Sequence, residues 1–221
     1  MTLDFTAIIP SIPFILEGIV ITLKYTFFSV FFGLILGMAL ALMKLSKKKL
    51  FSGFAVFYTS LFRGTPLLVQ LSLFYFATPQ LTGYKISAFE SGILAFSLNS
   101  GAYISEIIRA GIMAVDKGQF EAMKALGIPY TPGMKDLILP QALKNILPAL
   151  MNEIVDLLKE SSLVSVIGEM DLLRRANLVA SEKFIYFEPL LLVAVLYYIL
   201  VLIFSSCARL VEKRMKRHDT S

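Results

Sequence analysis

One face of a predicted helix that begins near residue 138 carries a row of polar and charged side chains. At 100° per residue, the side chains at 145, 152, 156 and 159 fall within about 60° of one another, and those at 153 and 160 extend the face by roughly 60° to 80°. They are Asn145, Asn152, Glu153, Asp156, Lys159 and Glu160. Carboxylates and amides in such a row can bind the amine or guanidinium of a cationic solute by charge complementarity.

Two interpretations of these side chains stay open. Asp156 and Lys159 can neutralise each other in an internal salt bridge, whereas Asn152 and Glu153 favour a pathway for a polar substrate. Asn99, in the predicted span over 88–111, is a candidate for the same pathway or for a helix–helix hydrogen bond. The candidate substrate-pathway residues are therefore Asn99, Asn152, Glu153 and Asp156.

The sequence lacks the residues on which several kinds of chemistry depend. Cys207 and His218 are the only cysteine and the only histidine, so no disulfide framework and no Cys-based metal site are expected. No G-x-x-x-x-G-K-[ST] run occurs, so the chain has no phosphate-cradling loop of its own. We expect no catalytic residue, no bound metal and no bound cofactor in this chain.

Composition indicates a membrane protein. Hydrophobic residues make up 57% of the 221-residue chain and charged residues 17%, and the mean hydropathy is +0.73, whereas a soluble domain is usually about 25% charged. Uncharged stretches of nineteen, twenty-one, fifteen and twenty residues follow Lys24, Arg63, Glu90 and Glu188. A helix needs about 20 apolar residues to cross a bilayer. This pattern excludes a soluble enzyme, and the placement of the +5 net charge argues against nucleic acid as the partner.

Basic residues cluster after the first, the third and the last of these uncharged stretches. Because short cytoplasmic segments are enriched in Lys and Arg, all three clusters are expected inside, which places the N-terminus outside and the C-terminus inside. The clusters are Lys44, Lys47, Lys48 and Lys49; Arg109, Lys117, Lys124 and Lys135; and Arg209, Lys213, Arg214, Lys216 and Arg217.

The number of crossings then requires a span that hydropathy alone scores poorly. The segment 112–136 and the C-terminal tail are both expected inside, so one crossing must precede the last apolar stretch, and 138–158 is the only candidate. A charged group at the bilayer centre costs at least ~2.5–3.5 kcal/mol, so its polar face must contact protein or a pathway. The expected spans are 14–43, 52–78, 88–111, 138–158 and 187–211, with a cytoplasmic loop at 112–136 and an extracytoplasmic segment at 160–186.

Three patterns inside the spans predict structural roles. Small residues recur every four positions at Ser29, Gly33, Gly37 and Ala41, which favours close helix packing. Pro66 predicts a kink in the second span, beside Arg63, which is expected to face protein in either a structural ion pair or a gating role. Glu106 and Arg109 form an i,i+3 pair of opposite charge.

The loop 112–136 contains a predicted short helix with signals at both ends. Asp116 and Gln119 resemble a capping box, and Gly127 is placed to end the helix in a left-handed cap, after which Pro129 prevents continuation. An apolar face recurs at helical spacing in Phe120, Met123 and Leu126. Such a helix can lie on lipid or dock into another protein.

Five motifs together resemble one family, the polar amino acid branch of the ABC importer permeases. GQFEAMKALGI (Gly118–Ile128) is similar to the family's cytoplasmic EAA loop, with Met123 in place of the usual second alanine. The others are RGTPLLVQ (Arg63–Gln70), NSGAYISEIIRAGI (Asn99–Ile112), LPQALKNILPAL (Leu139–Leu150) and NEIVDLLKESSLVSVIG (Asn152–Gly168). They follow the family's order along essentially the whole chain.

The resemblance implies an all-α, five-transmembrane-helix permease in the bacterial cytoplasmic membrane that carries a polar amino acid, with a lean to a cationic one such as arginine. It implies a second permease subunit, two ATP-binding subunits that hold ATP and Mg, and an extracytoplasmic amino acid binding protein. Residues 160–186 are a candidate contact for that binding protein, or a solvated loop. The residues implied in ATPase coupling are Gly118, Phe120, Glu121, Ala122, Met123, Leu126 and Gly127.

Two other functions are weighed against this one. An ion-coupled secondary amino acid transporter commonly has internal repeats, and none is evident here. A structural subunit without a conduction path is disfavoured by the polar face of the fourth span. The family resemblance therefore gives the preferred prediction.

Overall fold

A computed structural model of the chain describes residues 5–217, so the only histidine, His218, lies outside the described residues. The described part forms helices and no strand, which confirms the predicted all-α class. By length and composition, residues 5–45 and 187–210 form helices apolar enough to cross a membrane. The four longest helices are α2 (Gly18–Leu45), α6 (Ala88–Met113), α9 (Leu139–Glu160) and α11 (Phe187–Arg217).

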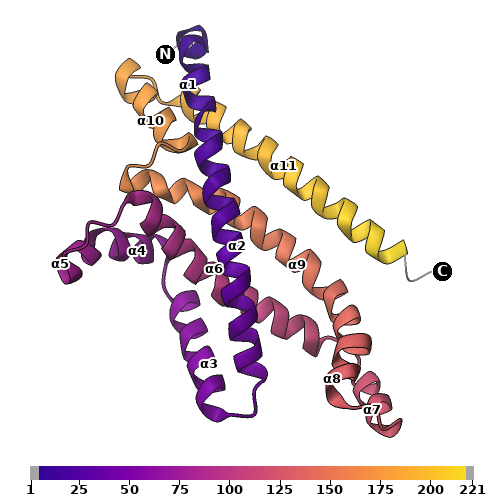
Figure 1. The fold of residues 1–221 in the computed structure, drawn as a ribbon. Coiled ribbons are helices and arrows are strands. Elements are labelled where there is room, and N and C mark those ends of the chain that lie inside the picture. The colour runs from indigo at the N-terminus through magenta and orange to yellow at the C-terminus, as the bar shows by residue number, and fades with distance from the viewer. Residues whose placement is uncertain (1–4, 218–221) are drawn as a thin grey trace.

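Shorter elements connect and cap these helices. Near the N-terminus are η1 (Phe5–Ser11) and α1 (Ile12–Leu16), and after α9 follow η4 (Ser161–Ile167) and α10 (Leu172–Lys183). Between α6 and α9 are α7 (Lys117–Ala125), α8 (Tyr130–Gly133) and the π-helical turn η3 (Met134–Ile138). Figure 1 shows α1 and α10 at one end of the molecule and α7 and α8 at the other.

The most extensive helix contact joins α2 and α6, and small residues make it possible. Ser29, Gly33, Gly37 and Ala41 are all buried, as the predicted packing stripe requires. A Cβ atom on Gly33 would lie 3.0 Å from Ser100 Oγ, and one on Gly37 would lie 2.5 Å from Ile104 Cγ2. The two backbones therefore approach more closely than any larger side chain at these positions allows.

The segment between α2 and α6 is a broken helix, as Pro66 predicted. It consists of α3 (Lys49–Gly64), α4 (Leu67–Ser72), the π-helical turn η2 (Leu73–Ala77) and α5 (Thr78–Thr82). Thr65 is extended, with φ −122° and ψ 144°, because proline disfavours the helical conformation of the residue before it. The carbonyl groups freed at the end of α3 therefore need other hydrogen-bond donors.

Two amide side chains supply those donors. Gln70 Nε2 donates to the Phe62 carbonyl oxygen at 2.8 Å and to Thr65 Oγ1 at 2.8 Å. Asn99 Nδ2, from α6, donates to the same Phe62 oxygen at 3.0 Å and to Gln70 Oε1 at 3.1 Å. Gln70 and Asn99 are both buried, so the break is a fixed feature that is bonded to the neighbouring helix.

At the end of the molecule that holds α1 and α10, Arg175 ties the two helices together. Its Nη1 donates to Glu17 Oε2 at 2.7 Å and to the Phe14 carbonyl oxygen at 2.8 Å, and its Nε donates to the Met170 carbonyl oxygen at 3.0 Å. The guanidinium also lies over the Phe14 ring, 4.6 Å from its centroid. One side chain therefore fixes α10 against the N-terminal segment.

A buried carboxylate starts α10. Asp171 accepts hydrogen bonds from the backbone N–H groups of Leu173, at 3.2 Å, and Arg174, at 2.9 Å, and from the Tyr197 hydroxyl at 3.4 Å. The residue has no exposed surface. Burial disfavours the charged form and raises the pKa of Asp171 to about 6, although these hydrogen bonds oppose the shift.

Candidate functional site

A polar cavity of about 530 Å³ lies between α6, α9 and η4. Its walls are mainly charged and hydrogen-bonding side chains, in contrast to the apolar surfaces of the same helices. They come from two positions of α6, four of α9 and two of η4: Asn99 and Tyr103; Glu153, Asp156, Lys159 and Glu160; and Ser162 and Leu163. Segments about sixty residues apart in the sequence therefore form one site.

The cavity carries an excess of negative charge. Three carboxylates and one ammonium group line it, which gives a formal charge of −2 when all four are ionised. Lys159 Nζ pairs with Asp156 Oδ1 at 2.7 Å, and both side chains are more than half exposed. This pair is the internal salt bridge that the sequence left as one alternative. The carboxylates of Glu153 and Glu160 remain to attract a cation into the cavity.

Asn99 makes the hydrogen bond between helices that the sequence left as one alternative, and it also lines the cavity. Its two hydrogen bonds to Phe62 and Gln70 use both N–H donors of the side-chain amide. The residue also lines the cavity, where its remaining polar group is a carbonyl oxygen. Asn99 can therefore only accept hydrogen bonds from a molecule in the cavity, and an amine or a guanidinium is such a donor.

The predicted pathway residues do not all meet at this site. Asn99, Glu153 and Asp156 line the cavity, whereas Asn152 is exposed and is not part of its wall. Asn145 lies two turns before Asn152 and contacts a different part of α6, where its Nδ2 donates to the Gly111 carbonyl oxygen at 3.5 Å. The polar row of α9 thus serves more than one neighbour along its length.

One aromatic residue of the cavity wall was not predicted from the sequence. Tyr103 lines the cavity one turn after Asn99, and the i,i+4 spacing of the two residues on one helix was the available signal. Arg63 lies over the Tyr103 ring, 5.0 Å from the centroid. Its side chain is exposed at the α3 break. Its neighbour is an aromatic ring, whereas the sequence left a structural ion pair and a gating role open.

The second candidate site is the loop helix α7, and its ends have the predicted caps. Asp116 accepts a hydrogen bond from the Gly118 N–H at 2.6 Å. Gly127 has φ +67°, and the bonds from Gly127 N to Lys124 O, at 3.1 Å, and from Ile128 N to Met123 O, at 3.0 Å, complete a Schellman motif. Glycine is needed there because other residues are strained at positive φ.

One detail of the predicted cap is wrong. Gln119 was expected to complete a capping box with Asp116, but its side-chain oxygen accepts a hydrogen bond from Gln141 Nε2 at 3.3 Å. Gln119 therefore links α7 to the start of α9. Asp116 therefore caps the start of α7 alone, because Gln119 does not complete the capping box.

The residues predicted to couple to the ATPase divide between an inner and an outer face of the loop. Met123 is buried, and a Cβ atom on Gly133 would overlap its sulfur, so Met123 packs tightly against α8. Phe120 packs against a buried cluster that includes Ile112 and Val115. The exposed members of the set are Gly118, Glu121, Ala122, Leu126 and Gly127. Met123 and Phe120 therefore hold the loop to the bundle, and the outer face is available to a partner.

The described residues therefore form an all-helical bundle with two helices that are long and apolar enough to cross a membrane and with a charged cavity between helices. A family model described as "binding-protein-dependent transport system inner membrane component" matches residues 29–217. The chain belongs to this family of transport permeases. The resemblance to the polar amino acid ABC permeases is thereby confirmed at the level of the family.

Curated relatives cover nearly the whole chain. A putative glutamine transport system permease protein of Rickettsia conorii is 58% identical over 206 residues, 93% of this chain and 94% of that protein. The arginine transport system permease protein of Bacillus subtilis is 54% identical over 99% of this chain and all of that protein. A solved structure, described as the crystal structure of an amino acid ABC transporter with histidines, is 47% identical with a TM-score of 0.93, covering 97% of this chain and 100% of the matched chain.

Proposed function

We propose that this chain is the membrane-spanning subunit of an ABC importer that carries a polar amino acid with a cationic side chain, such as arginine. The observation that carries the proposal is the cavity between α6, α9 and η4, where three carboxylates face one ammonium group. Relatives with 54–58% identity are named for arginine and glutamine transport. Charge complementarity with the cavity favours the cationic one of these two substrates.

The chain crosses the membrane five times in this proposal, with the N-terminus outside and the C-terminus inside. The arrangement of the helices supports it, because the connection between α2 and α3 and the loop that holds α7 and α8 lie at the same end of the molecule, and α1 and α10 lie at the other (Figure 1). The basic residues of these loops then face the cytoplasm, as the distribution of Lys and Arg favours.

A second permease subunit covers the cavity in the assembled transporter. Asp156 and Lys159 are more than half exposed on this subunit alone, within a helix that the proposal places in the membrane. Lipid contact with such charges costs several kcal/mol, so a protein partner or a water-filled pathway must face them. The partner is another copy of this chain or a similar subunit.

ATP hydrolysis drives the cycle from separate ATP-binding subunits, which hold ATP and Mg. They contact the outer face of α7 through Glu121, Ala122 and Leu126, which are exposed on a helix that both caps and the buried Met123 hold in place. An extracytoplasmic binding protein delivers the amino acid at the end formed by α1, α10 and residues 160–186.

The test is uptake by the complete transporter in sealed vesicles, with Glu153→Gln compared with Asp136→Asn. Both substitutions remove one negative charge, but Asp136 is exposed in η3 and lies outside the cavity. A lost charge-assisted hydrogen bond corresponds to an affinity decrease of roughly 10- to 100-fold for arginine. Glu153→Gln should show this decrease for arginine and little change for glutamine, with basal ATP hydrolysis retained.

Equal uptake of arginine by the two variants would overturn the cationic assignment. ATP-dependent uptake in vesicles without an ion gradient separates this function from an ion-coupled secondary transporter. Uptake that requires a gradient and no ATP would overturn the importer class itself.

A further inference from the structure

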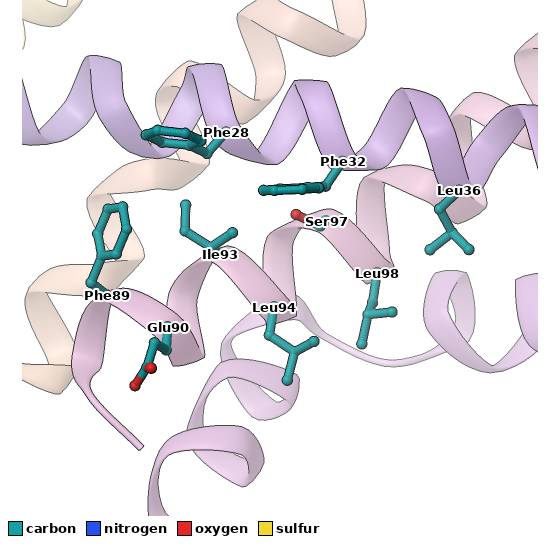
Figure 2. A pocket seen from close by; sticks show the side chains of 9 residues that line it. All are labelled: Phe28, Phe32, Leu36, Phe89, Glu90, Ile93, Leu94, Ser97 and Leu98. Carbon is teal, nitrogen blue, oxygen red and sulfur yellow. The ribbon is translucent and has the colours of Figure 1, made fainter. Parts of the chain in front are cut away.

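An apolar groove of about 540 Å³ runs between α2 and α6 (Figure 2). Three of its side chains come from α2 and six come from α6: Phe28, Phe32 and Leu36; and Phe89, Glu90, Ile93, Leu94, Ser97 and Leu98. From Phe28 to Leu36 the groove is about 12 Å long, at 1.5 Å per residue. This length fits within one leaflet of a bilayer, whose hydrocarbon half-thickness is roughly 15 Å.

The groove has one charged end. Glu90 lies in the first turn of α6, and Lys24 is exposed one helical turn before Phe28 on α2. The Tyr25 hydroxyl donates to the Ala88 carbonyl oxygen at 3.1 Å, which places these turns of α2 and α6 at the same level. A cation and an anion therefore flank the same end of an otherwise apolar groove.

The Glu90 carboxylate is held in a fixed position. Its Oε2 accepts hydrogen bonds from Ser87 N and Ser87 Oγ, both at 2.8 Å, and its Oε1 accepts one from the Tyr84 hydroxyl at 2.9 Å. A carboxylate can accept about four hydrogen bonds. One acceptor position on a preorganised anion is thus left for a donor at the end of the groove.

A polar group further along the groove is also without a partner. The Ser97 side chain is buried, and its Oγ has no hydrogen-bond partner among the described residues. Figure 2 shows Ser97 among the groove side chains, seven residues after Glu90 on the same helix. This corresponds to about 10 Å along the helix axis, and an ester carbonyl in the groove would satisfy the hydroxyl.

We propose that this groove binds one glycerophospholipid whose headgroup carries both a phosphate and a primary amine, such as phosphatidylethanolamine. The acyl chain runs from the level of Ser97 past Phe32, Leu36 and Leu98. The phosphate faces Lys24, the ammonium donates to Glu90, and an ester carbonyl accepts from Ser97. A choline headgroup has no N–H to donate, and a glycerol headgroup has no cation, so neither matches Glu90.

The absence of tryptophan from the sequence allows a direct test. Phe28→Trp places a single tryptophan in the groove of the full chain, which is reconstituted in vesicles that contain a brominated phospholipid as a contact quencher. Phe27→Trp is the matched control, because Phe27 is adjacent in sequence but lines a different groove with no charged residue in its wall. Phe32→Trp is a second reporter if Phe28→Trp does not fold.

Brominated phosphatidylethanolamine should quench the Phe28→Trp signal at an about tenfold lower mole fraction than brominated phosphatidylcholine or phosphatidylglycerol, as one charge-assisted hydrogen bond allows. The Phe27→Trp signal should show no headgroup preference. Adding Glu90→Gln should abolish the preference while helix α6 stays capped, because Gln also serves in the capping box. Equal quenching by the three lipids, or a preference that survives Glu90→Gln, would overturn the proposal and leave only non-specific lipid at this surface.

Discussion

Lys44 Nζ lies 2.6 Å from Glu106 Oε1, and only 2% of the Lys44 side chain is exposed. The same ammonium donates to Ser105 Oγ at 2.8 Å. Arg109 Nη2 also pairs with Glu106, at 2.7 Å, so the predicted pair between Glu106 and Arg109 exists and a third residue joins it. This ion triad fastens the end of α2 to α6.

The triad predicts an order of stability for two variants. Glu106→Gln leaves Lys44 buried without its counter-ion, and breaking a buried pair in this way costs about 3–5 kcal/mol. Lys44→Met should cost less, because Glu106 keeps Arg109. Thermal unfolding of the purified permease in detergent measures both. A larger effect of Lys44→Met than of Glu106→Gln would contradict the shared role of Glu106.

Replacement by alanine should change the unfolding temperature in opposite directions at two glycines, Gly37 and Gly53. At Gly37 the added Cβ would lie 2.5 Å from Ile104 Cγ2, whereas at Gly53, inside α3, nothing lies within 4 Å. Overpacking costs about 1–3 kcal/mol, and an unhindered replacement of glycine in a helix gains about 0.5–1 kcal/mol. Gly37→Ala should therefore lower the unfolding temperature and Gly53→Ala should raise it. A decrease of equal size in both would indicate that close approach of α2 and α6 is not the cause.

Asp171 predicts a pH dependence of stability. Its pKa rises from 3.8 to about 6 on folding, so the folded state binds the proton more tightly and stability falls as pH increases between these values. The stabilisation of the folded state by protonation of Asp171 is fully present below about pH 3.8 and is lost above about pH 6. It amounts to about 3 kcal/mol in the free energy of unfolding.

Asp171→Asn should weaken the dependence of stability on pH in this range. Asparagine keeps an oxygen that can accept the hydrogen bonds of the helix cap, but it does not titrate. The measurement is the unfolding temperature of both proteins from pH 4 to pH 7, and the informative quantity is their difference at each pH. A difference that stays constant over this range would show that Asp171 does not titrate there.

The outer face of α7 should be required for coupling. Glu121→Lys reverses a charge on that face, near the positive N-terminal end of the helix, and should uncouple transport from ATP hydrolysis while the protein remains in the membrane. Asp136→Lys makes the same charge change on an exposed residue outside α7 and should retain most of the uptake. Co-purification of the ATPase and uptake per ATP hydrolysed are the measurements, and full coupling in Glu121→Lys would refute the contact.

Reporter fusions should give a simple topology pattern. A reporter after Ser221 and one inserted at residues 46–50 should both be active only as cytoplasmic fusions, because the basic clusters hold these segments inside. A reporter at residues 80–84 should be extracytoplasmic. If the reporters at Ser221 and at residues 46–50 lie on opposite sides of the membrane, the chain crosses the membrane an odd number of times between them. The prediction of a fourth span at 138–158 would then be wrong.

Local sequence signals predicted the local geometry well. Pro66 marks the helix break and Gly127 the left-handed cap, because each restricts or permits backbone angles regardless of what surrounds it. The packing stripe of Gly33 and Gly37 was also predicted, since only small residues allow such close contact. These features depend on a few adjacent residues, which a single sequence contains in full.

The membership of the cavity could be predicted only in part. Periodicity put Asn152 and Glu153 on neighbouring parts of one helix face, but the direction in which that face points depends on how α9 packs against α6. Glu153 lines the cavity and Asn152 does not. Tyr103 is brought to Glu153 by the same packing, and Met123 is turned inward by its contact with Gly133. Local patterns show which residues share a helix face, but which faces meet depends on how the helices pack.

The hydrogen bonds of Asn99 connect the cavity to the break between α3 and α4. One amide group both lines the cavity and donates to Phe62 and Gln70, so a molecule in the cavity that binds two geometries of the break with different affinities changes their relative free energy. By thermodynamic reciprocity, straightening or bending the broken helix must change the affinity of the cavity by the same factor. The residue that fixes the shape of one helix is therefore also a point at which occupancy and helix geometry are energetically linked.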